Sequence, residues 1–305
     1  MGYPTISPYM DFRRTPLAPS GPTLERAGVG VVLSVVVPMY KEAARVGETL
    51  DDLVATLAAG AYLSEIILVD DGSPDATAAV VQPWLSEIPQ GAAGNLGRVV
   101  LVRHAVNRGK GAAVRTGLAA AAGQWVLMMD ADNAARVREV ARLWPLTPHR
   151  PAMVCGSRNA SDARVTSRAS RRFFGRIFRL ALGVLRLNLL HDTQCGFKLY
   201  RADVARAVVR LGREDGFAFD LEHLLIASRM GPIAEVGIAW EHKGGGTVNP
   251  VLDGLRMLRD AARIRWRFLT ERGPDHGEPA TAPSQGLSGA VIVVKPQAAS
   301  APIQS

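Results

Sequence analysis

The stretch Gln-Trp-Val-Leu-Met-Met-Asp-Ala-Asp-Asn, residues 124–133, decides the fold. Its apolar part, Trp125–Met129, is too short for a lone helix and is not interrupted by polar residues, which is typical of a strand buried on both faces of a parallel sheet. Asp130 and Asp132 follow it directly. If the extended backbone continues, the two carboxylates point to the same side, because side chains alternate along a strand.

The place of these two aspartates indicates a metal site. In open α/β sheets, ligands bind at the edge formed by the carboxyl ends of the strands. Oxygen donors such as Asp130 and Asp132 suit Mg²⁺ or Mn²⁺, which keeps waters and substrate phosphates as its other ligands. The alternative is that Asp-x-Asp merely begins a loop, since short motifs often occur by coincidence.

The chain around this stretch predicts repeated strand–helix units. Strands are predicted at Leu33–Val37, Ile66–Val69, Val99–Val102, Trp125–Met129 and from Ala152 to Gly156, and helices at Arg45–Ala59, from Ala76 with Asp75 as its cap, and at Ala112–Ala122. Short strands that alternate with helices of about ten or more residues favour right-handed βαβ units. The expected fold class is therefore α/β, with a Rossmann-like, mostly parallel central sheet flanked by helices.

Composition limits the partners and the location. The chain has 305 residues, a formal net charge of +8 and 48% hydrophobic residues, so it can bury a sizeable core and should be attracted to nucleic acid, a membrane surface or a phosphorylated substrate. Cys155 and Cys195 form neither a disulfide framework nor a zinc-ligand cluster, which favours a reducing cytosolic location. No apolar run reaches the roughly 18 residues of a spanning helix, so a soluble or peripheral protein is expected.

Four regions follow from the pattern along the chain. Residues 1–30 are proline-rich and aperiodic, and we expect a disordered arm. Residues 31–250 form the predicted α/β domain, and residues 251–270 form a C-terminal amphipathic helix. We expect residues 271–305 to be a disordered tail, interrupted only by the short apolar run Ala290–Val294.

The segment Asn107–Gly111 connects the third strand to its helix. It lacks the Walker spacing and the Ser or Thr after Lys110, which argues against a nucleoside triphosphatase. The first strand is not followed by Gly-x-Gly-x-x-Gly, so the dinucleotide fingerprint is absent as well. Lys110 then lies near the ligand edge, where its charge can neutralise a diphosphate; the alternative is a solvated basic turn.

Several motifs, taken in order, resemble one family. Val-Val-Val-Pro-Met-Tyr-Lys-Glu (35–42), Leu-Val-Asp-Asp-Gly-Ser (68–73), Asn-Arg-Gly-Lys-Gly (107–111) and Met-Asp-Ala-Asp (129–132) resemble the inverting GT-A glycosyltransferases of family 2, which use nucleotide sugars. Asp-Thr-Gln-Cys-Gly-Phe-Lys-Leu-Tyr (192–200) and Gly-Phe-Ala-Phe-Asp-Leu-Glu (216–222) are similar to its dolichyl-phosphate or polyprenyl-phosphate glucosyltransferase branch. The resemblance covers about Leu33 to Leu269.

The resemblance implies a role for each matching residue. The base and ribose would be held by Pro38, Tyr40, Glu42, Asp70 and Asp71, the rest of the donor by Asn107 and Lys110, the metal and diphosphate by Asp130 and Asp132, and the acceptor and sugar side by Asp192 and Gln194. Lys41 departs from the family, which usually has Asn there. The loop 243–248 also departs from the family's Gly-Ser-Lys-Val.

Arg158 follows the strand that begins near Ala152, which makes it a candidate phosphate ligand at the same sheet edge. The competing interpretation is a surface arginine. Asp192 and Asp220 are the candidate general bases if the acceptor is a hydroxyl. A phosphate acceptor is already ionised near neutral pH and needs orientation more than deprotonation.

Two predicted helices separate charge from apolar residues. Between Arg168 and Leu190, one stripe holds Arg168, Arg172, Arg176, Arg179 and Arg186; between Leu252 and Leu269, the stripe holds Arg256, Arg259, Arg263 and Arg267, opposed by Met257, Leu258, Ala261, Phe268 and Leu269. Such helices suit an interfacial position, with apolar faces at the acyl boundary and arginines at anionic headgroups. Alternatively, both faces pack onto the domain or onto a second subunit, as in a homodimer.

Together these features predict metal-dependent, inverting transfer of a hexose, glucose from UDP-glucose, to a polyprenyl or dolichyl monophosphate. The protein would be cytoplasmic and peripheral at the inner face of the cell membrane, with no nucleic-acid partner. One alternative is a soluble family 2 glycosyltransferase that acts on a hydroxyl acceptor or a polysaccharide. A second is a non-catalytic basic protein that binds membrane or nucleic acid, against which the clustered carboxylates argue.

Overall fold

The computed structural model describes residues 31–87, 94–159, 164–166, 183, 187, 189–241, 252–270 and 290–293. Its main sheet contains β1 (Leu33–Met39), β2 (Ser64–Asp70), β3 (Leu96–His104), β4 (Trp125–Met129), β5 (Met153–Ser157), β7 (Phe197–Arg201), β8 (Ile233–Gly237) and β10 (Ala290–Val293), in the order β10-β3-β2-β1-β4-β7-β5-β8. A separate parallel pair is formed by β6 (Arg164–Thr166) and β9 (Ala239–Glu241).

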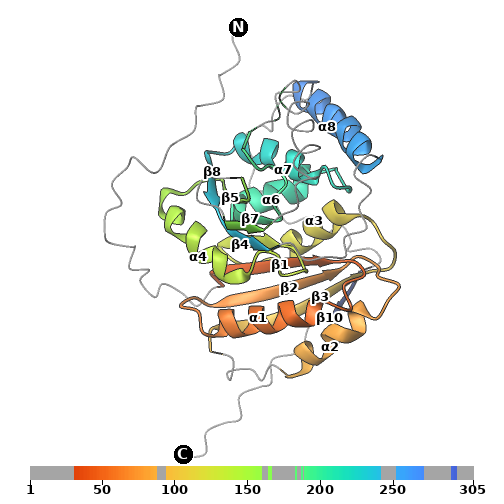
Figure 1. Cartoon of the computed structure of the whole chain (residues 1–305), viewed down its shortest axis with the longest axis vertical. Coiled ribbons are helices and arrows are strands. Elements are labelled where there is room, and N and C mark those ends of the chain that lie inside the picture. The colour runs from red at the N-terminus through yellow and green to blue at the C-terminus, as the bar shows by residue number, and fades with distance from the viewer. Residues whose placement is uncertain are drawn as a thin grey trace, which may run out of the picture.

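The helices cover both faces of this sheet (Figure 1). They are α1 (Val46–Ala58), α2 (Thr77–Glu87), α3 (Lys110–Ala120), α4 (Val140–Leu143), α6 (Ala202–Leu211), α7 (Phe219–Ser228) and α8 (Leu252–Thr270), with short 3₁₀ turns at Val137–Glu139 and Trp144–His149. Alternation along β1 divides the core: Val35 and Val37 pack with α1, whereas Val36 packs with α3 and α6. The sheet is thus buried on both faces, as continuous apolar strands require.

The predicted strand–helix units are confirmed, with shifts of a few residues at their ends. The opening stretch forms β4 over the predicted residues, and it pairs parallel to β1. Asp75 accepts a hydrogen bond from the Thr77 amide at 3.1 Å, as expected of a residue that caps α2. The sheet differs from an all-parallel one at β7, which runs antiparallel to both β4 and β5.

The apolar run that was excepted from the expected disordered tail contains a strand. Residues 290–293 form β10, which pairs antiparallel with β3 and becomes the edge strand of the sheet. Three of its four residues, Val291, Ile292 and Val293, are β-branched, a residue type that is enriched in strands. The N-terminal arm, the arginine-striped segment 168–190 apart from a few isolated residues, and the loop 243–248 lie outside the described residues.

Helix α8 is present where the pattern predicts it, but its apolar face is not free. Ala261 and Ile264 are buried against Leu221 and Leu225 of α7, with Met257 and Phe268 beside them. The apolar face of α8 therefore packs onto the domain, which was the alternative to contact with lipid acyl chains. Within the described ranges, no helix combines the length and apolarity needed to cross a membrane.

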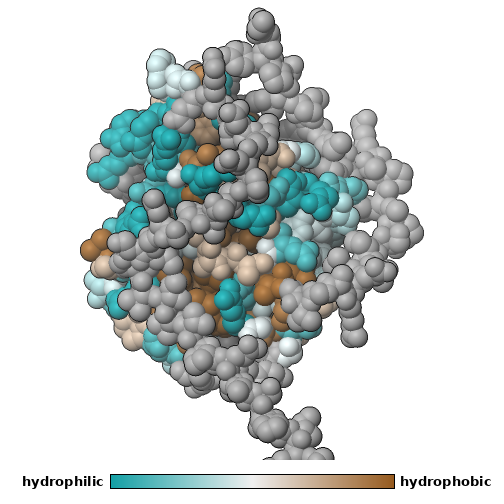
Figure 2. All heavy atoms as spheres, turned by 180° about the vertical axis from the view of Figure 1, so that it is seen from behind, coloured by the Kyte–Doolittle hydropathy of each residue, from teal (hydrophilic) through white to brown (hydrophobic). Residues whose placement is uncertain are grey.

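The face seen from behind is more hydrophilic in its upper part than in its centre (Figure 2). Seen from behind, hydrophilic residues are prominent in the upper half and apolar residues gather in the central and lower part (Figure 2). Figure 1 places α8 at the upper end of the molecule. The basic helix therefore lies at the more polar end.

Candidate active site

The carboxyl ends of β1, β2 and β4 form the expected ligand edge, and its central pair is Lys110 with Asp130. Lys110 opens α3, Asp130 follows β4, and the Lys110 Nζ lies 2.6 Å from the Asp130 Oδ1. Burial alone would lower the pKa of Lys110, but the charges of Asp130 and then Asp220 outweigh it and raise the pKa. The amine is therefore a cation paired with Asp130, although residues 105–108 of the same turn are exposed to solvent. A role of Lys110 toward a diphosphate stays a prediction.

Gly196 lets this pair form. A Cβ at Gly196 would lie 2.0 Å from the Asp130 Oδ2, closer than any side chain tolerates. Gly196 of the Asp-Thr-Gln-Cys-Gly-Phe string therefore lies directly against Asp130 of the Asp-x-Asp motif, which is possible because glycine has no side chain. Sequence reasoning quoted Gly196 without assigning it this role.

Asp132 and Glu42 complete an acidic group around Asp130. The Asp132 Oδ1 accepts the Ala134 amide at 3.0 Å, and Glu42 holds Arg45 through two contacts of 2.8 Å. Burial raises the pKa of Glu42, Arg45 opposes this, and the charges of Asp132 and Asp130 add to the rise. The charges of Asp132 and Asp130 therefore act on Glu42.

This donor set fits a hard divalent cation. Within the described residues, no three His, Cys, Asp or Glu side chains form a metal-holding group by themselves. Mg²⁺ and Mn²⁺ commonly use one or two carboxylates and complete their coordination with substrate phosphates and water. Asp130 and Asp132 would hold such a cation, which would stabilise negative charge on a departing diphosphate.

Asp192 is bound to Arg158. The guanidinium donates from Nε at 2.7 Å and Nη2 at 2.8 Å, and the Arg158 amide adds a third bond at 3.0 Å. Burial would raise the pKa of Asp192, but the hydrogen bonds and charge of Arg158 outweigh it and hold the pKa below its usual value. Arg158 is therefore not a free surface arginine, and Asp192 is a weak base.

Asp220 lies in a second buried ion pair. Its Oδ1 is 2.6 Å from Nζ of Lys198, a residue with no exposed surface, and the same Nζ donates to the Cys195 carbonyl at 2.6 Å. Burial raises the pKa of Asp220, while Lys198 and then Lys110 oppose the rise. Lys198 thus links the Cys195 carbonyl to Asp220, whose surface is only 5% exposed.

Asp71 holds the 107–111 turn. It accepts hydrogen bonds from the Arg108 amide at 2.9 Å, the Gly109 amide at 2.8 Å and the Asn107 side chain at 3.0 Å, and it contacts His104 Nδ1 at 2.7 Å. With 3% of its surface exposed, its carboxylate is committed to the protein. Asp71 thereby sets the position of the turn that carries Lys110. The role toward base and ribose that the resemblance implies for Asp71 stays a prediction.

The remaining donor-side residues differ in access. Pro38 is buried in β1, whereas Tyr40 is 41% exposed. Asp70 is fully buried, accepts the Ser73 amide at 3.0 Å and lies 3.0 Å from the Arg103 Nε. Their contacts to base and ribose stay predictions.

Lys41 has a left-handed backbone, with φ of 58°. Asparagine adopts this conformation far more readily than lysine, which explains why the family usually has Asn there.

Three supporting residues escaped the sequence analysis. Lys198 has a signal in hindsight, since it is a charged residue inside an otherwise apolar strand. Glu235 of β8 accepts the Asp192 amide at 2.8 Å and the His191 amide at 3.0 Å, and His104 bridges Asp71 to Thr116. Nothing local marks Glu235 or His104, because their partners lie on other elements.

Comparison with solved structures defines the class of fold. The chain resembles glucosyl-3-phosphoglycerate synthase from Mycobacterium tuberculosis, solved with Mn²⁺, UDP-glucose and phosphoglyceric acid, at a TM-score of 0.54 and 22% identity over 81% of this chain and 82% of that one. A mannosyltransferase from Pyrobaculum calidifontis, solved with GDP-mannose and Mn²⁺, matches at a TM-score of 0.50 and 20% identity over 77% and 70%. The fold is that of the GT-A glycosyltransferases.

Sequence comparison defines the family. Residues 34–209 match glycosyl transferase family 2. Dolichyl-phosphate beta-glucosyltransferases of Dictyostelium discoideum and Homo sapiens are each 33% identical over 78% of this chain, and over 75% and 76% of their own lengths. The chain belongs to glycosyl transferase family 2, in its dolichyl-phosphate beta-glucosyltransferase branch, and it is a glycosyltransferase.

Proposed function

We propose that this enzyme transfers glucose from UDP-glucose to a polyprenyl monophosphate, with inversion at the sugar and with Mg²⁺ or Mn²⁺ held by Asp130 and Asp132. The relatives named for transfer to dolichyl phosphate support the lipid-phosphate acceptor. One similar structure, which contains UDP-glucose and Mn²⁺, supports the donor and the metal.

One observation carries the choice of acceptor. Both candidate general bases are held in ion pairs, Asp192 by Arg158 and Asp220 by Lys198. A hydroxyl acceptor needs a base in the transition state, whereas a phosphate monoester arrives ionised. The site therefore suits an acceptor that only has to be oriented.

The residues would divide the work as follows. Lys110 and the carboxylate-bound cation would offset the charge of the donor diphosphate. Arg158, held by Asp192, would present a positive charge toward an anionic acceptor at the same edge. Gly196 keeps the approach to Asp130 open.

We also propose that α8 meets the inner face of the membrane with its outer face rather than with its packed one. Trp266 is 70% exposed and Leu269 is 49% exposed, and Arg259 and Arg263 lie on the same side at helical spacing. An aromatic and an aliphatic residue among arginines suit an anionic lipid surface.

Product analysis tests the reaction. The enzyme is incubated with a panel of labelled nucleotide sugars, a polyprenyl monophosphate or a polyprenol of the same length, and either Mn²⁺ or EDTA. We expect a glucosylated lipid phosphate from UDP-glucose only, no product from the polyprenol, and no product in EDTA. Efficient transfer to the polyprenol would favour the hydroxyl-acceptor alternative.

A variant tests the metal ligand. Asp132→Asn, which keeps the acceptor for the Ala134 amide, should lose transfer while its melting temperature stays near the wild-type value.

A further inference from the structure

Residues Arg213–Gly216, called here the 213–216 segment, connect α6 to α7 and lie against the turn that carries Lys110. The Gly111 amide donates to the Asp215 carbonyl at 2.8 Å. A Cβ at Gly109 would lie 2.3 Å from the Asp215 carbonyl oxygen, and one at Gly111 would lie 2.2 Å from that of Glu214. Both glycines of the turn are therefore needed for this contact. The 213–216 segment packs directly against the first residues of α3.

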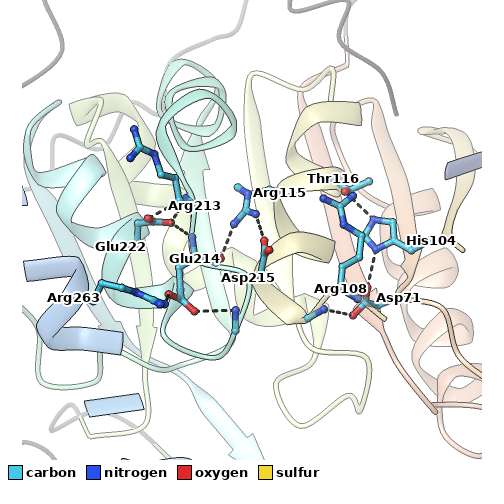
Figure 3. A network of polar contacts seen from close by, with 12 residues as sticks. Asp71, His104, Arg108, Arg115, Thr116, Arg213, Glu214, Asp215, Glu222 and Arg263 are labelled. Carbon is cyan, nitrogen blue, oxygen red and sulfur yellow. Dashed lines mark hydrogen bonds and ion pairs between the residues drawn. The ribbon is translucent and has the colours of Figure 1, made fainter. Parts of the chain in front are cut away.

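Side chains from two helices hold the segment in place (Figure 3). Arg115 of α3 donates to the Glu214 carbonyl at 2.5 Å and forms an ion pair with the Asp215 carboxylate. Glu222 of α7, which is fully buried, accepts the Arg213 amide and the Glu214 amide, each at 2.9 Å. These bonds order a stretch that has no helix or strand of its own.

Helix α8 supplies the remaining partners. The Glu214 carboxylate accepts the Gly216 amide at 3.0 Å and lies 2.9 Å from an Arg263 Nη2. Arg267 forms an ion pair with Glu222. Two arginines of the predicted basic stripe thus reach the carboxylates that shape the 213–216 segment.

We propose that Glu214 and Arg263 are positioning residues of the transfer reaction, which hold the 213–216 segment against the 107–111 turn and so place Lys110 for the donor diphosphate. The chain of contacts runs from Arg263 to Glu214, through the segment to Gly111, and so to Lys110 at the head of α3. The inference rests on the proposed function, because it takes Lys110 to be a ligand of the donor. If the inference holds, the position of α8 on the domain affects how tightly the donor binds, because α8 carries Arg263.

A matched pair of variants tests this. Arg259 and Arg263 are 73% and 65% exposed on the same helix, and both lie near Asp260, at 3.0 and 3.3 Å, but only Arg263 reaches Glu214. The dissociation constant of UDP-glucose is measured by calorimetry with Mn²⁺ and without acceptor or lipid. Arg263→Ala should weaken donor binding about two- to fivefold, the range expected for an exposed pair, and Arg263→Lys should recover part of it. Arg259→Ala should leave the constant unchanged.

A double-mutant cycle separates positioning from general damage. Glu214→Gln keeps an acceptor for the Gly216 amide but loses the charge, so it should weaken donor binding about as much as Arg263→Ala. The double variant should be no worse than either single one, because both remove the same interaction. Melting temperatures are measured in parallel.

Three results would overturn the proposal: equal donor affinity in the Arg259 and Arg263 variants, additive losses in the cycle, or losses that merely follow the melting temperature. Failure of the proposed function is a different result, since the wild-type enzyme would then bind no UDP-glucose. If it binds another nucleotide sugar, the same cycle with that donor decides the positioning role. If it binds none of the panel, both proposals fall.

Discussion

Aspartates at one sheet edge have different tasks because their partners differ. Asp71 is 3% exposed and surrounded by donors from its own protein, so it shapes a turn. The Asp130 side chain is 36% exposed and faces a single lysine at 2.6 Å, so it stays available to a ligand. A carboxylate contributes to binding only if the protein leaves one of its oxygens open.

Gly196→Ala should disable the site with only moderate loss of stability. The new Cβ would lie 2.0 Å from Asp130, so the carboxylate must leave its place beside Lys110. We expect a cost of about 1–3 kcal/mol in the free energy of unfolding, as for overpacking elsewhere, and a large drop in kcat. Gly47→Ala is the control, since its Cβ would be 3.4 Å from Trp84. Wild-type kcat in Gly196→Ala would contradict this placement of Asp130.

Asp192→Asn should keep appreciable turnover if the acceptor is a phosphate. The variant loses the charge that orients Arg158, but no proton has to be removed from the acceptor. With a hydroxyl acceptor the same change should cost on the order of 10²–10⁴-fold, and the remaining rate should rise at alkaline pH. The pH profile of kcat for wild type and variant distinguishes the two; a loss of about 10³-fold with alkaline recovery would exclude the phosphate acceptor.

The same variant has a predicted pH signature in stability. Because Arg158 holds the pKa of Asp192 below its usual value, the ionised pair stabilises the folded state above the unfolded pKa of about 3.9. This contribution is lost as the pH falls through the lower folded pKa. The stability difference between wild type and Asp192→Asn should therefore be present at pH 7 and shrink below about pH 4. Denaturant titrations across this range measure it.

Elements are tied together here by buried charges as well as by apolar packing. Strand β7 carries Lys198 and helix α7 carries Asp220, and their contact at 2.6 Å joins the sheet to the helix beneath the site. A lysine with no exposed surface is tolerated only with such a partner. The pair thus specifies how α7 sits on the sheet.

Lys198→Met should destabilise the fold by about 3–5 kcal/mol, because it leaves the Asp220 carboxylate buried without its cation. The double variant Lys198→Met with Asp220→Asn should recover much of this loss, since no unpaired charge remains. Chemical denaturation of the single and double variants measures both effects. A single variant as stable as wild type would mean that Asp220 is already neutral in the folded state.

At the scale of the whole molecule, α8 should bind anionic lipid surfaces through its outer face. Partitioning onto anionic vesicles should fall as salt rises to physiological strength, where the Debye length is about 8 Å. Trp266→Ser should weaken it at every salt concentration, because Trp266 is 70% exposed. Val106→Ser, which changes a 66%-exposed apolar residue outside α8, is the control. Equal binding to neutral and anionic vesicles would contradict this prediction, and α8 would then have only a structural role.

The sequence by itself determined the βαβ order, the place of the Asp-x-Asp pair after β4, the helix at 252–270 and the family. These features depend on neighbouring residues, since periodicity and strand ends are local properties of the chain. The nine-residue string that begins at Asp192 also pointed to the right branch of the family. It did so as a resemblance, without the contacts that explain it.

Only the tertiary structure decided which charges meet. The reversal of β7, the pairing of β10 with β3 and the packed face of α8 all depend on partners far along the chain. Arg158 meets Asp192 across 34 residues, and Arg263 meets Glu214 across 49. A helical stripe shows that arginines share a face, but whether that face binds lipid, solvent or a buried carboxylate depends on what folds against it.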